Sequence, residues 1–141
     1  MKKLLLVSLV IVVILTVGCA KTKTPEQEKP SQIIEDITPQ EAFTLIQNNK
    51  NNPDFVIIDV RTAEEFAEGH IENAINIDYH SETFREELNK LDKNKTYLVY
   101  CASGGRSAAA LDIMQELGFR EAYNMLGGIN QWTAEGLPTT K

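Results

Sequence analysis

The sequence predicts an α/β fold in which a central, mainly parallel sheet of five strands is flanked by helices on both faces. Short apolar runs that resemble buried strands alternate with helical patterns from residue 33 to residue 138. The run at residues 55–59 is continuously apolar up to its last residue, as expected for a central strand buried on both faces. These two observations indicate strand–helix units around a parallel sheet.

Five short runs are the predicted strands. They lie at residues 32–37, 55–59, 74–77, 97–101 and 122–125. Most are rich in branched or aromatic side chains and are bounded by turn residues or by a helix. Ligands of open α/β sheets bind at the carboxyl ends of the strands, which is where Cys101 ends the fourth run.

Helical segments follow the strands. They lie at residues 39–47, 62–65, 82–91, 106–117 and 129–135. Thr38 and Glu41 have the spacing of a capping box, and Thr62 and Glu65 repeat it ahead of a short helix. Gly118 is suited to end the fourth helix. Because no internal repeat is present, we expect one domain at residues 33–141.

An apolar segment precedes this domain. Residues 4–17 are almost wholly apolar and follow two lysines, as in a secretory signal peptide. The Gly18-Cys19 pair then resembles the lipobox of bacterial lipoproteins, which implies cleavage before Cys19 and a lipid on that residue. We therefore expect a signal peptide at residues 1–18 and an extracytoplasmic protein anchored to the bacterial membrane. An uncleaved signal anchor is the alternative.

Residues 19–32 are expected to be a flexible, lipid-anchored linker, because residues 20–32 contain no aromatic or branched aliphatic side chain. The net charge of the whole chain is −6. Without the two lysines of the signal peptide, 12 basic and 20 acidic residues leave −8. This balance argues against a nucleic-acid partner and against a polybasic contact with anionic lipid.

Cysteine and histidine usage limits the cofactors. Cys19 and Cys101 are the two cysteines, so a lipid on the first leaves the second without a disulfide partner. His70 and His80 have no metal-ligand spacing with each other or with a cysteine. We expect neither a metal nor an organic cofactor.

The loop after the fourth strand carries the clearest chemistry. Four residues, two of them glycine, separate Cys101 from Arg106, and a helix follows. Such a loop can turn its N–H groups inward, and the helix start and Arg106 add positive charge. A thiol there is expected to lose its proton and act as a nucleophile. The predicted catalytic residue is Cys101, and the predicted substrate-binding residues are Ala102, Ser103, Gly104, Gly105 and Arg106.

At these residues the chain resembles the rhodanese family of sulfurtransferases, whose active loop is a cysteine, a short Gly-containing turn and commonly an arginine. Two further blocks resemble the family over residues 33–138. They comprise Asp59-Val60-Arg61, Glu65-Phe66, Gly69-His70-Ile71 and Ala74-Ile75-Asn76-Ile77, and then Leu126-Gly127-Gly128-Ile129 with Trp132. The resemblance implies a single-domain rhodanese-like sulfurtransferase.

The family's chemistry implies that Cys101 takes sulfane sulfur from thiosulfate or a persulfide, and that the resulting persulfide passes it to a thiol or cyanide. Arg106 would bind an anionic donor. Ser103 and Ser107 are candidate hydroxyl donors, and Ser107 is also suited to the helix start. Asp59 and Arg61 are expected to form a structural pair near the site.

Two other functions share these motifs. Cell-cycle tyrosine phosphatases related to rhodanese have a loop that is one residue longer between cysteine and arginine, which suits a larger tetrahedral group. A non-catalytic binding or redox-sensing module is the other alternative, although inactive relatives typically lack the cysteine that this chain keeps.

Overall fold

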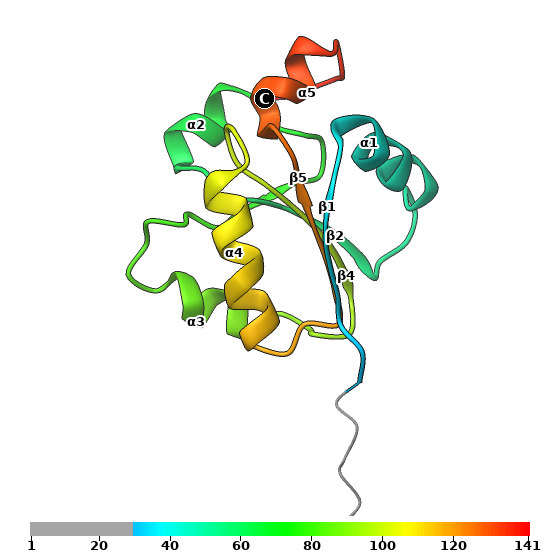
Figure 1. Cartoon of the computed structure of the whole chain (residues 1–141). Helices are drawn as coiled ribbons and strands as arrows, with labels where there is room; N and C mark the ends of the chain where they lie inside the picture. Colours follow the sequence, from blue (N-terminus) through cyan, green and yellow to red (C-terminus); the bar gives the residue numbers. More distant parts are fainter. Residues whose placement is uncertain (1–29) are drawn as a thin grey trace, which may run out of the picture.

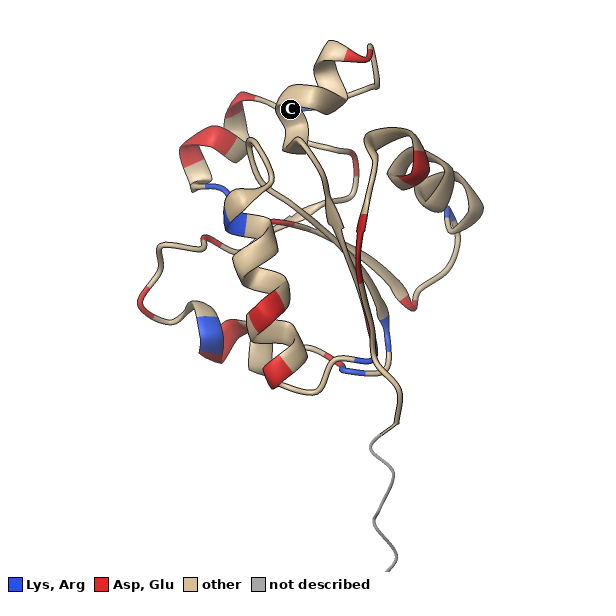
Figure 2. Ribbon diagram, in the orientation of Figure 1, with Lys and Arg blue, Asp and Glu red and all other residues tan. Residues whose placement is uncertain are grey.

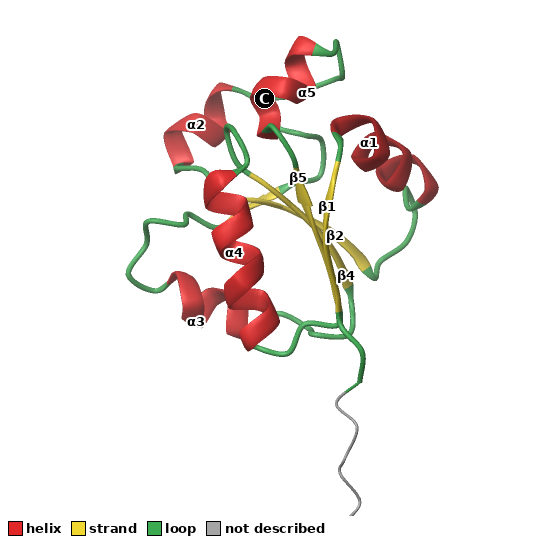
Figure 3. Ribbon diagram, in the orientation of Figure 1, coloured by secondary structure: helices red, strands yellow, loops and turns green. Residues whose placement is uncertain are grey.

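In the computed structural model, which describes residues 30–141, one sheet of five parallel strands runs in the order β1-β5-β4-β2-β3 (Figures 1 and 3). The predicted α/β class is confirmed, and every strand pair is parallel. The predicted signal peptide, Cys19 and most of the predicted linker lie outside the described residues. In chain order the elements are β1 (Ile33–Ile37), α1 (Pro39–Asn48), β2 (Phe55–Asp59), α2 (Ala63–Glu68), β3 (Ile75–Asn76), α3 (Phe84–Asn89), β4 (Thr96–Tyr100), α4 (Gly105–Glu116), β5 (Glu121–Met125) and α5 (Gly128–Ala134).

Strand β4 lies at the centre of the sheet and is buried on both faces. Successive side chains of a strand point to opposite sides, so Tyr97 and Val99 pack with α3 and α4, and Leu98 and Tyr100 pack with α1 and α5. Full burial of one such apolar side chain contributes about 1.5–3 kcal/mol. The apolar clusters on the two faces of the sheet therefore hold rigidly the strand that ends next to Cys101.

Both predicted capping boxes are present. The side chain of Thr38 accepts the N–H of Glu41, and the Glu41 carboxylate accepts the N–H of Thr38. Thr62 and Glu65 make the same reciprocal pair at the start of α2. Each pair satisfies two N–H groups that the first turn of a helix leaves without partners.

Two elements are shorter by at least two residues than the sequence predicts. Strand β3 has only two residues, because Ala74 donates its N–H to the carbonyl of Ile71 in the preceding turn and the partner strand β2 ends at Asp59, opposite Asn76. Helix α3 covers Phe84–Asn89 instead of residues 82–91. Ser81 and Thr83 join their side chains in a turn just before it, and Lys90 caps its end. Neither difference moves the carboxyl edge of the sheet.

Candidate active site

Three neighbouring strands bring residues to one edge of the sheet. Cys101 directly follows β4, Asp59 ends β2, and Leu126 directly follows β5. Because β2, β4 and β5 are adjacent and parallel, their carboxyl ends lie side by side. The residues after β4 therefore lie between those that follow its two neighbours.

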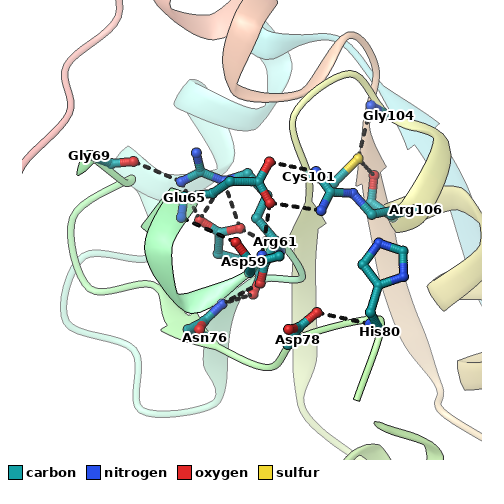
Figure 4. Close-up of polar contacts among 12 residues, drawn as sticks. Asp59, Arg61, Glu65, Gly69, Asn76, Asp78, His80, Cys101, Gly104 and Arg106 are labelled. Carbon is teal, nitrogen blue, oxygen red and sulfur yellow. Dashed lines mark hydrogen bonds and ion pairs between the residues drawn. The ribbon is translucent and has the colours of Figure 1, made fainter. Parts of the chain in front are cut away.

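The thiol of Cys101 is enclosed by the loop that follows it. Its Sγ accepts the backbone N–H of Gly104 at 3.1 Å and the hydroxyl of Ser107 at 3.4 Å (Figure 4). Gly104 has a φ of +102°, a conformation that favours glycine, and this turns the chain into α4. Cys101 is only 1% exposed, whereas Ser103 and Gly105 are exposed at the rim of the loop.

Opposing effects determine the pKa of the Cys101 thiol. Burial raises it, and hydrogen bonds to the sulfur from the Ser107 hydroxyl and from the N–H groups of Ser107, Gly104 and Ser103 lower it. The hydrogen bonds prevail, so the pKa lies below its ordinary value. The leading stabilising contact is the Ser107 hydroxyl, which lies fully buried on the first turn of α4.

Helix α5 holds the other side of the Cys101 loop. The N–H of Ile129 donates to the carbonyl of Cys101 at 2.9 Å, and that of Asn130 donates to the carbonyl of Ala102 at 3.1 Å. Gly128 has a φ of +58°, and a Cβ there would lie 2.4 Å from the Cys101 carbonyl oxygen. In the sequence, Gly127-Gly128 belongs to a block that resembles the family, but the sequence predicts no role for either glycine. The structure shows that Gly128 allows α5 to contact the loop backbone.

Arg106 lies beside the thiol but points its guanidinium at α2. Its Nη1 and Nη2 each donate to one carboxylate oxygen of Glu65, both at 2.8 Å (Figure 4). This hydrogen-bonded pair is the main reason that the pKa of Glu65 falls to about 2. The side chains of Arg106 and Glu65 are 22% and 33% exposed, so solvent reaches the pair. The sequence analysis places Glu65 in a capping box and in a block that resembles the family, but it predicts no contact with Arg106.

Asp59 and Arg61 form a buried ion pair beside the site. Arg61 Nη2 lies 2.6 Å from Asp59 Oδ2, and the two side chains are 7% and 0% exposed. Arg61 also donates to the carbonyl of Gly69, and its guanidinium lies 5.8 Å from the ring centre of Tyr100. The pair thereby joins the end of β2 to the turn after α2, and none of these bonds involves Cys101.

Three hollows in the described part of the chain lie outside the Cys101 loop. A cavity of about 520 Å³ lies between α1 and α5, but no residue of the loop lines it. A smaller one of about 210 Å³ is lined by Arg61 and by Ile129 and Asn130 of α5. A third hollow, of about 280 Å³, lies between β1 and α4. Because Cys101 lines none of the three, the chemistry of its loop identifies the site, and the volume of a cavity does not.

Within residues 30–141, no group of three or more His, Cys, Asp or Glu side chains is placed to hold a metal ion. Over the same span, no helix is both long enough and apolar enough to cross a membrane.

Known proteins resemble this chain in sequence and in structure. The model of the rhodanese-like domain family matches residues 39–135. A sulfurtransferase of Allochromatium vinosum is 32% identical over 95 residues, which are 67% of this chain and 87% of that protein. The thiosulfate sulfurtransferase GlpE of Coxiella burnetii is 36% identical over 94 residues, which are 67% of this chain and 82% of that protein.

Solved structures agree with these matches. The crystal structure of a rhodanese-like domain protein from Staphylococcus aureus has a TM-score of 0.59 and 35% identity, over 76% of this chain and 99% of that one. A rhodanese-related protein from Thermoplasma volcanium has a TM-score of 0.62 and 33% identity, over 75% of this chain and 97% of that one.

The α/β sheet, the cysteine loop after its central strand and these similarities together define the class: the chain belongs to the rhodanese-like domain family. Within that family it is a rhodanese-type sulfurtransferase, as its relatives of 32–36% identity indicate. Its partners are therefore a sulfur donor and a thiol acceptor.

Proposed function

We propose that this sulfurtransferase moves sulfane sulfur from thiosulfate or a persulfide donor to a thiol or cyanide acceptor, through a persulfide on Cys101. The observation that carries the proposal is the enclosure of Cys101 Sγ by the N–H of Gly104 and the hydroxyl of Ser107. Both groups donate to sulfur, so they favour the thiolate, which is the nucleophilic form. The reaction needs no metal or organic cofactor.

In the first step the Cys101 thiolate attacks the outer sulfur of the donor. With thiosulfate, the new Cys101 S–S bond forms as the donor S–S bond breaks, and sulfite leaves as a dianion. With a persulfide R–S–SH, the same attack leaves R–S⁻ and a protonated persulfide on Cys101. Both products conserve charge and electrons, as expected of covalent catalysis in two steps.

In the second step an acceptor attacks the terminal sulfur and releases the Cys101 thiolate. Cyanide thereby becomes thiocyanate, and a thiol becomes a persulfide. We assign stabilisation of the terminal sulfur to N–H groups of the loop formed by Ala102, Ser103, Gly104, Gly105 and Arg106, in the manner of an oxyanion hole. Ser103 and Gly105 lie at the exposed rim, where donor and acceptor would enter.

Intact-mass measurement tests the proposal. After incubation of the protein with thiosulfate or a persulfide, wild type should gain one sulfur atom, and cyanide should remove it as thiocyanate. Cys101→Ser should show neither change, because a hydroxyl cannot carry the persulfide. Equal turnover by wild type and Cys101→Ser would refute the assignment.

The two alternatives predict other results in the same protein. A redox-sensing or binding module would not form thiocyanate from either donor. A phosphatase would hydrolyse aryl phosphates in a reaction that requires Cys101. We expect no such hydrolysis, since only four residues separate Cys101 from Arg106.

We further propose that the enzyme acts outside the cytoplasm while attached to the bacterial membrane by a lipid on Cys19. The support is the apolar segment at residues 4–17 followed by Gly18-Cys19. Metabolic labelling with a fatty-acid analogue should label wild type and not Cys19→Ala. Label that persists in Cys19→Ala would exclude this anchor.

A further inference from the structure

The guanidinium of Arg106 is already occupied by a carboxylate. Both of its terminal nitrogens donate to Glu65, at 2.8 Å each. This bidentate geometry is the one by which arginine binds an oxyanion such as a sulfonate. An anionic donor that uses Arg106 must therefore displace Glu65 or share the guanidinium with it.

The other charges near the loop do not supply a replacement. Arg61 is buried and paired with Asp59. Helix α2, whose sequence is Ala-Glu-Glu-Phe-Ala-Glu, contains three acidic and no basic residues, and it faces the first turn of α4 (Figure 2). His80, on the loop between β3 and α3, also turns its ring toward Arg106 (Figure 4). A dianion thus approaches a balanced ion pair, and the helix that supplies Glu65 carries two further acidic residues, Glu64 and Glu68.

The two donor classes respond differently to this arrangement. Thiosulfate carries two negative charges, and its leaving group is the sulfite dianion. A persulfide on an uncharged carrier carries at most one, and its leaving group is a thiolate. Since charge–charge energy scales with the product of the charges, a carboxylate near the entrance disfavours thiosulfate more.

We propose that Glu65 determines donor specificity by holding Arg106, so that the enzyme prefers persulfide donors R–S–SH to thiosulfate. The proposal rests on the proposed sulfur-transfer function and deepens it. Glu65 is a positioning residue, because it acts through Arg106 and not on the reacting sulfur. Arg106 lies between Glu65 and Cys101 (Figure 4), so a change in their pairing alters the charge next to the thiol.

The chain contains a matched control for the structural role of Glu65. Glu65 Oε2 also accepts the N–H of Thr62 at 2.9 Å in the capping box of α2. Glu65→Gln keeps an amide oxygen for that bond and removes the charge, since glutamine serves the same capping position. Glu41 forms the equivalent bond with Thr38 in α1, at 2.8 Å, without an ion pair to any described residue. Glu41→Gln therefore reports the effect on capping alone.

The experiment compares wild type, Glu65→Gln and Glu41→Gln with two donors, thiosulfate and N-acetylcysteamine persulfide, at one pH and with cyanide as the acceptor. For wild type, kcat/KM should be at least about tenfold higher with the persulfide. In Glu65→Gln we expect the KM for thiosulfate to fall about tenfold, with persulfide kinetics within about twofold of wild type. Glu41→Gln should match wild type with both donors.

The dependence of the KM for thiosulfate on salt concentration is a second measurement, and a purely structural role of Glu65 would leave it unchanged. In Glu65→Gln, Arg106 attracts thiosulfate without an opposing carboxylate, so added salt should raise the KM for thiosulfate more steeply than in wild type. Persulfide kinetics should respond weakly to salt in all three proteins.

The results separate this proposal from the proposed function. If wild type turns over but Glu65→Gln leaves the donor preference unchanged, or lowers kcat/KM equally for both donors, donor selection by Glu65 is refuted and sulfur transfer stands. If neither donor adds sulfur to Cys101 in wild type, the proposed function fails and this inference fails with it.

Discussion

Replacing Gly128 with alanine perturbs the contact between α5 and the Cys101 loop. The added Cβ would lie 2.4 Å from the Cys101 carbonyl oxygen and 2.5 Å from the carbonyl carbon of Ala102. Ordinary contacts begin near 3.4 Å, so the two backbones must separate by about 1 Å. A misplacement of that size near a reacting atom costs about a hundredfold in rate, and we expect that loss in persulfide formation on Cys101.

The same substitution should lower the free energy of unfolding by about 2–4 kcal/mol. Overpacking contributes about 1–3 kcal/mol, and the left-handed φ of +58° adds about 1 kcal/mol. Gly136→Ala is the matched control. Its φ is +76°, and no atom lies within 4 Å of the added Cβ, so it carries the backbone cost without the clash.

Rapid-quench mass spectrometry measures persulfide formation at a temperature where circular dichroism shows all variants folded, and urea unfolding measures stability. Gly136→Ala should lose about 1 kcal/mol and keep the wild-type rate. Retention of the wild-type rate by Gly128→Ala would refute the role of α5. An equal slowing in Gly136→Ala would show that destabilisation, and not loop displacement, controls the rate.

Three further predictions concern individual polar contacts. Ser107→Ala should raise the pKa of Cys101, because the thiolate loses the hydrogen bond from the Ser107 hydroxyl. Thiolate absorbance against pH measures this, and an unchanged midpoint would contradict the assignment. Asp59→Asn should lower the free energy of unfolding by about 3–5 kcal/mol, since Arg61 stays buried without a counter-charge; a loss below about 1 kcal/mol in urea unfolding would exclude that role. The pKa of Glu65 is about 2 in the fold, below the ordinary 4.5. Its ion pair therefore stabilises the fold fully above pH 4.5, and this contribution is lost as the pH falls toward 2. Glu65→Gln should remove that part of the acid dependence of unfolding, and identical acid profiles for the two proteins would disprove it.

The capping boxes show what kind of feature can be predicted from the sequence. Thr38 and Glu41 lie three positions apart, as do Thr62 and Glu65, so one turn of helix brings each pair together in any fold. Both pairs are predicted for that reason, and both are confirmed. The ion pair between Glu65 and Arg106 was missed, because 41 positions separate the two residues.

The Cys101 loop shows the same division within the site. The sequence places a cysteine, two glycines and an arginine in one tight turn, and that spacing is enough to predict a thiol among backbone N–H groups. The sequence offers Ser103 and Ser107 as candidate hydroxyl donors and does not decide between them. The Ser107 hydroxyl donates to the sulfur only because the first turn of α4 points it into the core.

By itself, the sequence determined the α/β class, the approximate positions of the strands and helices, and the thiol loop, because these depend on neighbours within a few residues. The tertiary structure decided what surrounds the loop. The strand order β1-β5-β4-β2-β3 places β2 and β5 on either side of β4. Elements that follow those two strands, α2 with Glu65 and α5 with Gly128, consequently meet the Cys101 loop from opposite sides. Local sequence patterns cannot determine this arrangement, because it depends on packing between segments that are distant in the chain.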